Sequence, residues 1–592
     1  MTFTRLLLLA LVLVAFPVLA DSIDDSTVDP HANFEALVAD FEAHELANDP
    51  IRAGRDGDLE AAARWPDLSA ANIQARRAVE ADFMQRLAEI RADSLPESAQ
   101  VSHAVLYYLL DSRLSLDPFK PQRLPFTNDS GFFSAPMQLA SSTRPRSAAD
   151  AEAWIARMRA LPAFLAQHRE WLAQGLEDGF VQPGLIAGRA LEQIQALAKL
   201  ETEDHPLLAP LEQLPRHVAA EERDRLSLAG REALEQAVLP AYRELAEFFS
   251  NEYLADPRQS TGISELPGGR EYYRELVRHH TTLDLSPEEV HQRGLAEVAR
   301  IRADMLEVIA DSGFEGGFAD FLEYLRSDPR FYARSERELL MQAAFIAKRA
   351  DDAMPRFFRR LPRLPYGVRP VPASIAPNYT TGRYWAGDLD AGVAGGYMVN
   401  TYRLDQRPLY ELPALTVHEA VPGHHHQVAI TQELEEVPDF RRNTYITAFG
   451  EGWALYSEHL AIEMDIYEDA YQHFGRLTYE MWRACRLVVD TGLHYFGWSQ
   501  AEAEACLLDN SALAPHNVRT EVERYISWPG QALAYKPGEM LIRELREAAE
   551  SRLGSDFDIR DFHDHILSEG AMPLSLLEAR MRAWVAAQEK ET

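Results

Sequence analysis

The chain has 592 residues, and 92 Asp or Glu outnumber 59 Lys or Arg, so its formal net charge at neutral pH is −33. A surface this acidic repels nucleic acid and anionic lipid, and no basic patch reverses it, so we expect no nucleic-acid partner. The charge says little about the substrate, and its simplest consequence is solubility.

The first twenty residues have the composition of a secretory signal. Arg5 precedes the apolar run LLLLALVLVAF, and Val18-Leu19-Ala20 offers a small-residue cleavage site before Asp21. The run is short for a membrane span, no later stretch is apolar enough, and no cysteine stands directly after the run, where a lipid anchor would need one. We therefore expect residues 1–20 to be a signal peptide, and the mature protein to be periplasmic or secreted without a membrane anchor.

Helical periodicity dominates the remaining chain. Segments such as NFEALVADFEAHELA repeat apolar residues at three- and four-residue spacing. Ser286-Pro287-Glu288-Glu289 combines a capping serine, a proline at the first helical position and a glutamate at the third. The fold is therefore predicted to be mainly α. The clearest loop, residues 260–269, divides an N-terminal helical lobe (21–265) from a C-terminal lobe (266–592).

Few stretches favour strands. The best is YMVNTYR at Tyr397–Arg403, which follows the glycine-rich DLDAGVAGG.

The stretch HEAVPGHHHQ at residues 418–427 is the strongest candidate for a metal site. Two cysteines, Cys485 and Cys506, are too few for a cysteine-rich site, so His and carboxylate must hold any metal; whether the two pair as a disulfide stays open. His418-Glu419 supplies a ligand beside a general base. Pro422 stands where a regular helix would place the second histidine, so the helix must bulge or kink between residues 421 and 423. Such a break favours His424 as second ligand over His425.

A third ligand is expected from FGEGWALYSEHLA. Glu451 opens a predicted amphipathic helix, and Glu458, seven residues later, shares its face. Glu451 then completes a His, His, Glu set for one zinc ion per chain. Glu458 is placed to orient one of the histidine ligands, and His425 is expected to support the site without binding the metal.

Together with RLVVDTGLHYFGW and RYISWPGQALAYKPG, these motifs resemble the bacterial family called "domain of unknown function 885", over most of the mature chain. More distantly, HE…GH followed by a helix with glutamates seven apart resembles the helical gluzincins of the thimet oligopeptidase and angiotensin-converting-enzyme type. The resemblance implies two helical lobes around a deep channel, a small edge β-sheet near the active site, and cleavage of short peptides. The Pro-Gly insertion departs from those distant relatives.

The same resemblance suggests further site residues. The strand before the metal helix would bind extended substrate, with Tyr397 and Asn400 as contacts. Tyr535 matches the late tyrosine that donates to the substrate carbonyl oxygen in helical gluzincins. His494 is the second choice for that donor, although the row Arg486, Asp490, His494 is equally consistent with a structural ion-pair row. Arg524 and Tyr525 are candidates for binding a substrate carboxylate or backbone.

The leading hypothesis is thus an exported zinc peptidase that acts on a peptide substrate. The chain has no G-x-S-x-G elbow, which fits a metal mechanism. Two alternatives stay open. One is a metal-dependent amidase or esterase with a non-peptide substrate, and the other is a non-catalytic, peptide-binding protein of zincin fold. The sequence does not fix the oligomeric state or the choice between exo- and endopeptidase.

Overall fold

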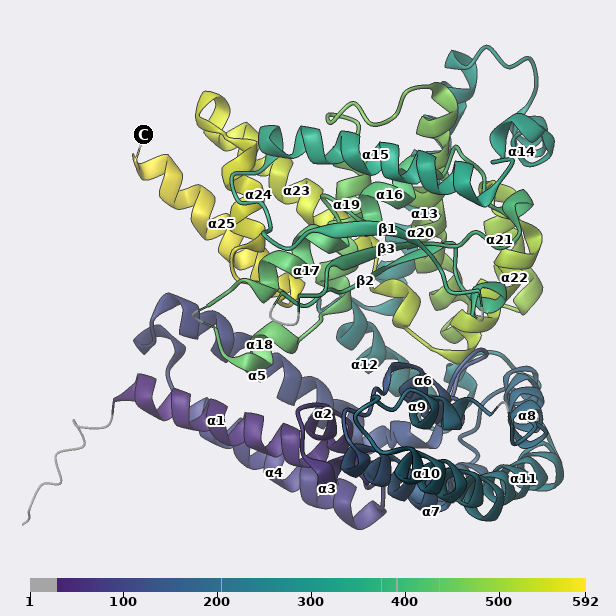
Figure 1. The fold of residues 1–592 in the computed structure, drawn as a ribbon. Coiled ribbons are helices and arrows are strands. Elements are labelled where there is room, and N and C mark those ends of the chain that lie inside the picture. The colour runs from purple at the N-terminus through teal and green to yellow at the C-terminus, as the bar shows by residue number, and fades with distance from the viewer. Residues whose placement is uncertain (1–28, 204, 374, 390–391, 436, 592) are drawn as a thin grey trace, which may run out of the picture.

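The computed structural model describes residues 29–203, 205–373, 375–389, 392–435 and 437–591. The predicted signal peptide lies outside these residues. The fold is mainly α-helical with one small mixed sheet, as the periodicity predicts (Figure 1).

The helices of the N-terminal half gather in the lower part of Figure 1. Their bounds are α1 (Pro30–Asn48), α2 (Pro50–Arg55), α3 (Leu59–Ala62), α4 (Ala70–Glu89), α5 (Glu97–Leu116), α6 (Ala135–Ser142), α7 (Ala148–Asp178), α8 (Gly184–Ala198), α9 (Ala209–Glu212), α10 (Ala220–Ala233) and α11 (Leu239–Phe248).

Helix α12 lies between this group and the upper part of the molecule, which holds the sheet and the remaining helices (Figure 1). Their bounds are α12 (Gly269–Thr281), α13 (Pro287–Asp311), α14 (Phe318–Ser327), α15 (Glu336–Phe357), β1 (Tyr366–Pro370), β2 (Gly382–Trp385), β3 (Gly395–Val399), α16 (Leu412–Glu419), α17 (His424–Gln432), α18 (Asp439–Asn443), α19 (Thr447–Leu460), α20 (Ala470–His494), α21 (Gln500–Asn510), α22 (Pro515–Ser527), α23 (Lys536–Leu553), α24 (Ile559–Leu567) and α25 (Leu574–Glu591).

The start of α13 confirms the predicted capping box. The Ser286 hydroxyl accepts from the Glu289 amide at 3.2 Å, and the Glu289 carboxylate accepts from the Ser286 amide at 2.8 Å. Each side chain satisfies a backbone donor that the first helical turn leaves free. Proline at the first helical position costs nothing there, because its missing N–H has no partner in a helix anyway.

The two largest apolar cores both cross the boundary near residue 265. One joins α1, α4 and α5 to the C-terminal half; Phe41 of α1, for example, packs edge-on against Phe440 of α18 at 5.7 Å between ring centroids. The other joins α7, α8 and α11 to α13, α20 and α22. Helix α20 is buried along nearly its whole length, so it forms the axis on which both halves pack.

The sheet has the strand order β1-β3-β2, with β1 parallel and β2 antiparallel to β3. The strand predicted at Tyr397–Arg403 corresponds to β3, which begins two residues earlier and ends at Val399. All five of its residues are buried. It is the central strand, with both of its backbone edges paired, so the expectation that this segment is an edge strand is wrong.

The two cysteines are free thiols. The sulfur of Cys485 lies 3.7 Å from the carbonyl oxygen of Cys506, so the residues are neighbours without being bonded through sulfur. Within the described part of the chain, no helix is both long and apolar enough to span a bilayer.

Candidate metal centre

The metal motif lies where two helices meet at a sharp break. Helix α16 ends at Glu419, a four-residue turn that contains a cis Val421–Pro422 bond follows, and α17 begins at His424. The Gly423 amide donates to Val417 O at 3.0 Å, which folds the turn back over the end of α16. A Cβ on Gly423 would lie 1.9 Å from His418 O, so only glycine fits. The predicted kink between residues 421 and 423 is confirmed.

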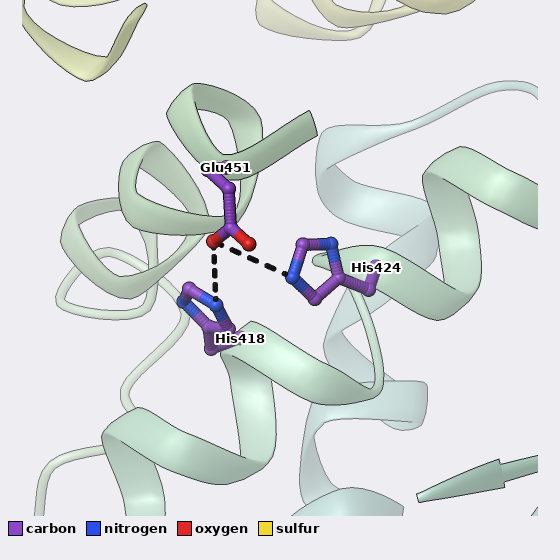
Figure 2. Close-up of side chains that lie close together, drawn as sticks. All are labelled: His418, His424 and Glu451. Atoms are coloured by element: carbon purple, nitrogen blue, oxygen red, sulfur yellow. Dashed lines mark ion pairs between the residues drawn. The ribbon is translucent and has the colours of Figure 1, made fainter. Parts of the chain in front are cut away.

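This break brings two histidines and a glutamate together (Figure 2). The Nε2 atoms of His418 and His424 lie 3.4 Å and 3.7 Å from Oε2 of Glu451, which α19 contributes from the opposite side. The two rings are 4.8 Å apart and almost perpendicular. The three candidate ligand atoms all lie within 4.8 Å of one another.

The residues present fit a zinc ion. Glu451 Oε2 is buried and has no hydrogen-bond partner, although a buried carboxylate oxygen normally has one. Two imidazoles and one carboxylate are the donor set of many catalytic zinc sites, which keep a further position open.

His418 is oriented by a second carboxylate on α19. Its Nδ1 lies 2.8 Å from Oε1 of Glu458, so Nε2 is the nitrogen turned toward Glu451. Burial lowers the pKa of His418, but the carboxylates of Glu451 and Glu458 outweigh this effect and raise it to about 9. Glu458 thus occupies the position expected from its spacing to Glu451, at the back of the first histidine.

Glu419 is held by the sheet rather than by the histidines. Its Oε2 accepts a hydrogen bond of 2.6 Å from the Tyr384 amide of β2. Only 7% of Glu419 is exposed. A buried carboxylate next to a candidate ligand, with one oxygen fixed by a backbone donor, is well placed to act as a general base.

His425 points away from this group. Its Nδ1 lies 3.1 Å from the Tyr384 hydroxyl, and its ring is 4.6 Å from that of Tyr366. Burial lowers the pKa of His425 to about 4, so the ring is neutral. The geometry therefore places His424, and not His425, beside His418, while His425 supports the strand that holds Glu419.

Tyr397 and Asn400 are not placed to contact a substrate. Both side chains are fully buried. The Tyr397 hydroxyl bonds with Thr416 Oγ1 at 3.2 Å, and the Asn400 amide donates to three backbone carbonyls of the loop before β2. Their predicted role as substrate contacts is contradicted, because β3 is central and these side chains stabilise the sheet.

His494 is also structural. Its Nδ1 accepts from the Ile263 amide at 3.1 Å, and Nε2 lies 2.9 Å from Tyr525 O. The side chain is completely buried, and burial lowers its pKa to about 4. With both nitrogens bonded to backbone, it cannot donate to a substrate, so the second choice of donor is wrong.

Tyr535 caps a helix that crosses α19 beside Glu451, because α19 and α23 touch at two glycines. A Cβ on Gly452 would be 2.5 Å from the Cα of Gly538, so these helices cross in backbone contact there. Glu451 adjoins the first glycine, and Tyr535 caps α23 one turn before the second. The helix crossing thus brings the chain segments of Tyr535 and Glu451 together, and the role of Tyr535 as a donor stays a prediction.

Tyr445 was missed by sequence reasoning. The Tyr445 hydroxyl packs against Gly450, the residue before Glu451; a Cβ added to this glycine would lie 2.5 Å from the hydroxyl oxygen. Burial, and then the negative charge of Glu451, raise the pKa of Tyr445 well above its usual value, with smaller contributions from Tyr535 and Glu419. Yet 49% of its surface is exposed. Tyr445 is therefore both close to Glu451 and open to solvent, and only the tertiary contacts reveal this.

Two other groups of acidic and histidine residues have suitable spacing, but each already holds a cation. Lys536 Nζ lies 3.0, 2.9 and 2.7 Å from carboxylate oxygens of the Glu297, Glu480 and Glu539 group. Arg113 pairs with both carboxylates of the group formed by His44, Glu45 and Glu80. Among such groups in the described residues, only the His418 cluster contains no side-chain cation.

Fold and site thus define a mainly α protein with a His, His, Glu cluster at a broken helix. The chain belongs to the family described as "bacterial protein of unknown function (DUF885)", whose model matches residues 50–581.

Two solved structures are similar. A crystal structure of a "putative lipoprotein" from Colwellia psychrerythraea is 27% identical, with a TM-score of 0.88 over 95% of this chain and 100% of the other. A "putative lipoprotein of unknown function" from Shewanella oneidensis is 17% identical, with a TM-score of 0.71 over 93% and 99%, and shares the fold. No curated protein matches the chain.

Proposed function

We propose that this protein is an exported, zinc-dependent peptidase that hydrolyses peptide bonds in short peptides. The observation that carries the proposal is the convergence of His418, His424 and Glu451, with the carboxylate of Glu419 fixed beside them. A site that only stored metal would have no use for that carboxylate. In this proposal the fold is zincin-like, with two helical lobes around a channel that opens at the metal centre.

When bound, zinc lowers the pKa of a coordinated water and polarises a carbonyl group. The chain's own residues supply the remaining chemistry. Glu419 takes the proton from water with one carboxylate oxygen, while the Tyr384 amide holds the other. Glu458 keeps His418 turned toward the cluster. The phenols of Tyr535 and Tyr445 are available as donors to the carbonyl oxygen on which negative charge develops.

The substrate backbone is proposed to lie along β2 rather than β3. Strand β2 pairs with β3 on one side, and on its other side the Tyr384 amide points to Glu419. An extended peptide added to this edge would pass beside the proposed base. Tyr384 and its neighbours Arg383 and Trp385 therefore replace Tyr397 and Asn400 as the candidate substrate contacts.

Export is supported by the signal-like residues 1–20 and by the description of both structural relatives as "putative lipoproteins". The cysteines of this chain, at positions 485 and 506, lie far from the signal-like segment, where a lipoprotein would carry its lipidated cysteine.

The test is metal content by elemental mass spectrometry together with digestion of a peptide library. About one zinc per chain is expected in the wild type and in Glu419→Gln, with cleavage only in the wild type, whereas Glu451→Ala should lose the metal. Full metal occupancy in Glu451→Ala would refute the ligand assignment. Zinc without peptide cleavage in the wild type would shift the function to a non-peptide amide or ester. Absence of both metal and cleavage would indicate a binding protein.

A further inference from the structure

A buried arginine with an unused donor lies next to Tyr535. The guanidinium carbon of Arg486, on α20, lies 4.1 Å from the centroid of the Tyr535 ring and 4.5 Å from that of Trp482. Its Nε donates to the Tyr525 hydroxyl at 3.1 Å, and Nη2 lies 3.2 Å from Glu521. Only 4% of Arg486 is exposed, and its Nη1 is buried without a hydrogen-bond partner. A buried charged donor left unpaired is costly, so this nitrogen indicates a missing acceptor.

A second arginine makes the surroundings positive. Arg524, on α22, donates to Glu521 at 2.9 Å and to the side chain of Gln531. Two guanidinium groups therefore share the single carboxylate of Glu521. Asp490 forms no ion pair with either arginine and accepts hydrogen bonds from the Tyr273 hydroxyl and the Gly530 amide. Within the ion pairs of the two arginines, two positive charges therefore meet one carboxylate.

Of the two arginines, Arg524 is the one open to water. The exposed fractions of the Arg524 and Glu521 side chains are 18% and 17%, whereas Arg486 is 4% exposed. Trp528, just after α22, is 48% exposed. A ligand can therefore reach Arg524 without unfolding the protein.

The position of the pair relative to the metal cluster follows from the helix crossing described above. Glu451 and Tyr535 flank the contact between α19 and α23, and Arg486 packs on the Tyr535 ring. Through Tyr535, Arg486 is thus connected to the helix crossing beside Glu451.

We propose that Arg486 and Arg524 bind the C-terminal carboxylate of the substrate, so that the enzyme acts as a carboxypeptidase. The inference rests on the proposed function and deepens it by naming the substrate class. A planar carboxylate matches the donor geometry of guanidinium groups and neutralises the excess charge. In the reaction, the peptide C–N bond breaks, the hydroxyl of water joins the carbonyl carbon and its proton goes to the leaving amine.

The first test is binding to zinc-loaded Glu419→Gln, which does not turn over its ligand. Calorimetry would compare two N-acetylated tripeptides of identical sequence, one with a free C-terminal carboxylate and one with a C-terminal amide. We expect the free acid to bind ten- to a hundredfold more tightly, because a charged hydrogen-bonding pair is lost in the amide. Arg524→Gln in the same background should remove the preference. Arg519→Gln, five residues earlier on α22 and 65% exposed, should keep it.

Equal affinities for acid and amide, or a preference that survives Arg524→Gln, would overturn the carboxylate site. Turnover of the same peptide pair by the wild-type zinc enzyme separates this inference from the proposed function. Cleavage of acid and amide at equal rates leaves a peptidase without a carboxylate site. Selective binding without cleavage of either peptide supports the carboxylate site and refutes hydrolysis of peptides.

Discussion

Replacing Glu458 by Gln tests whether the contact behind His418 tunes a metal site. Glutamine has nearly the same volume and keeps an oxygen that can accept from Nδ1 of His418. The substitution therefore removes the charge and leaves the 2.8 Å contact possible. Because Glu458 is 2% exposed, bulk water cannot screen the lost charge.

The expected loss of zinc affinity is close to tenfold. Changes to a group that holds a metal-ligating histidine cost about 10–100-fold in affinity, or roughly 1.4–2.7 kcal/mol. Nη2 of Arg483 lies 3.9 Å from Glu458 Oε1 and already offsets part of the charge, which favours the lower end, about 1.4 kcal/mol.

Affinity would be measured by competition with a chromophoric zinc chelator, after circular dichroism has shown that the variant is folded. Glu463→Gln is the matched control. Glu463 lies five residues further along the chain, is 43% exposed and pairs with Arg546, so its replacement should leave zinc affinity unchanged. A zinc affinity for folded Glu458→Gln within twofold of the wild type would refute the reasoning that this carboxylate supports a metal ligand.

Three further predictions concern stability. Gly423→Ala places a Cβ 1.9 Å from a backbone oxygen. This variant should lower the free energy of unfolding in urea by about 1–3 kcal/mol and should abolish zinc binding. The control Gly188→Ala, which has open space around the new Cβ, should change neither quantity. Lys536→Met removes the one cation that Glu297, Glu480 and Glu539 all share. It should cost about 3 kcal/mol in the same assay, the low end for a broken buried pair, because Arg300, Arg476 and Arg543 still pair with these carboxylates; a loss under 1 kcal/mol would contradict the network. Burial raises the pKa of Asp490 to about 7 from an ordinary value of 3.8, so its contribution to stability is fully present below pH 3.8 and is lost as the pH rises through 7. Asp490→Asn should therefore flatten part of the decline in unfolding free energy between pH 4 and 7, and an unchanged slope would contradict the raised pKa.

The sequence alone determined the features that depend on local spacing. Apolar periodicity predicted a mainly α fold, and the Ser286 capping box marked the start of α13, because both arise from contacts within a few residues of one helix. Pro422 and Gly423 predicted the break in the metal helix for the same reason. Proline lacks the amide hydrogen that a helix needs and glycine lacks a Cβ, and both properties affect the backbone at the residue itself. The seven-residue spacing of Glu451 and Glu458 placed both on one helix face.

Tertiary structure decided what depends on which segments become neighbours. The strand at residues 397–399 looked the same in sequence whether central or at an edge, and the pairing with β1 and β2 made it central. His494 and Arg486 share one face of α20, yet backbone atoms from other segments use both nitrogens of the histidine, while one nitrogen of the arginine stays unpaired. Tyr445 joined the site only through packing against Gly450. A side chain's role is set by the partners that reach it, and those partners come from elements far apart in the chain.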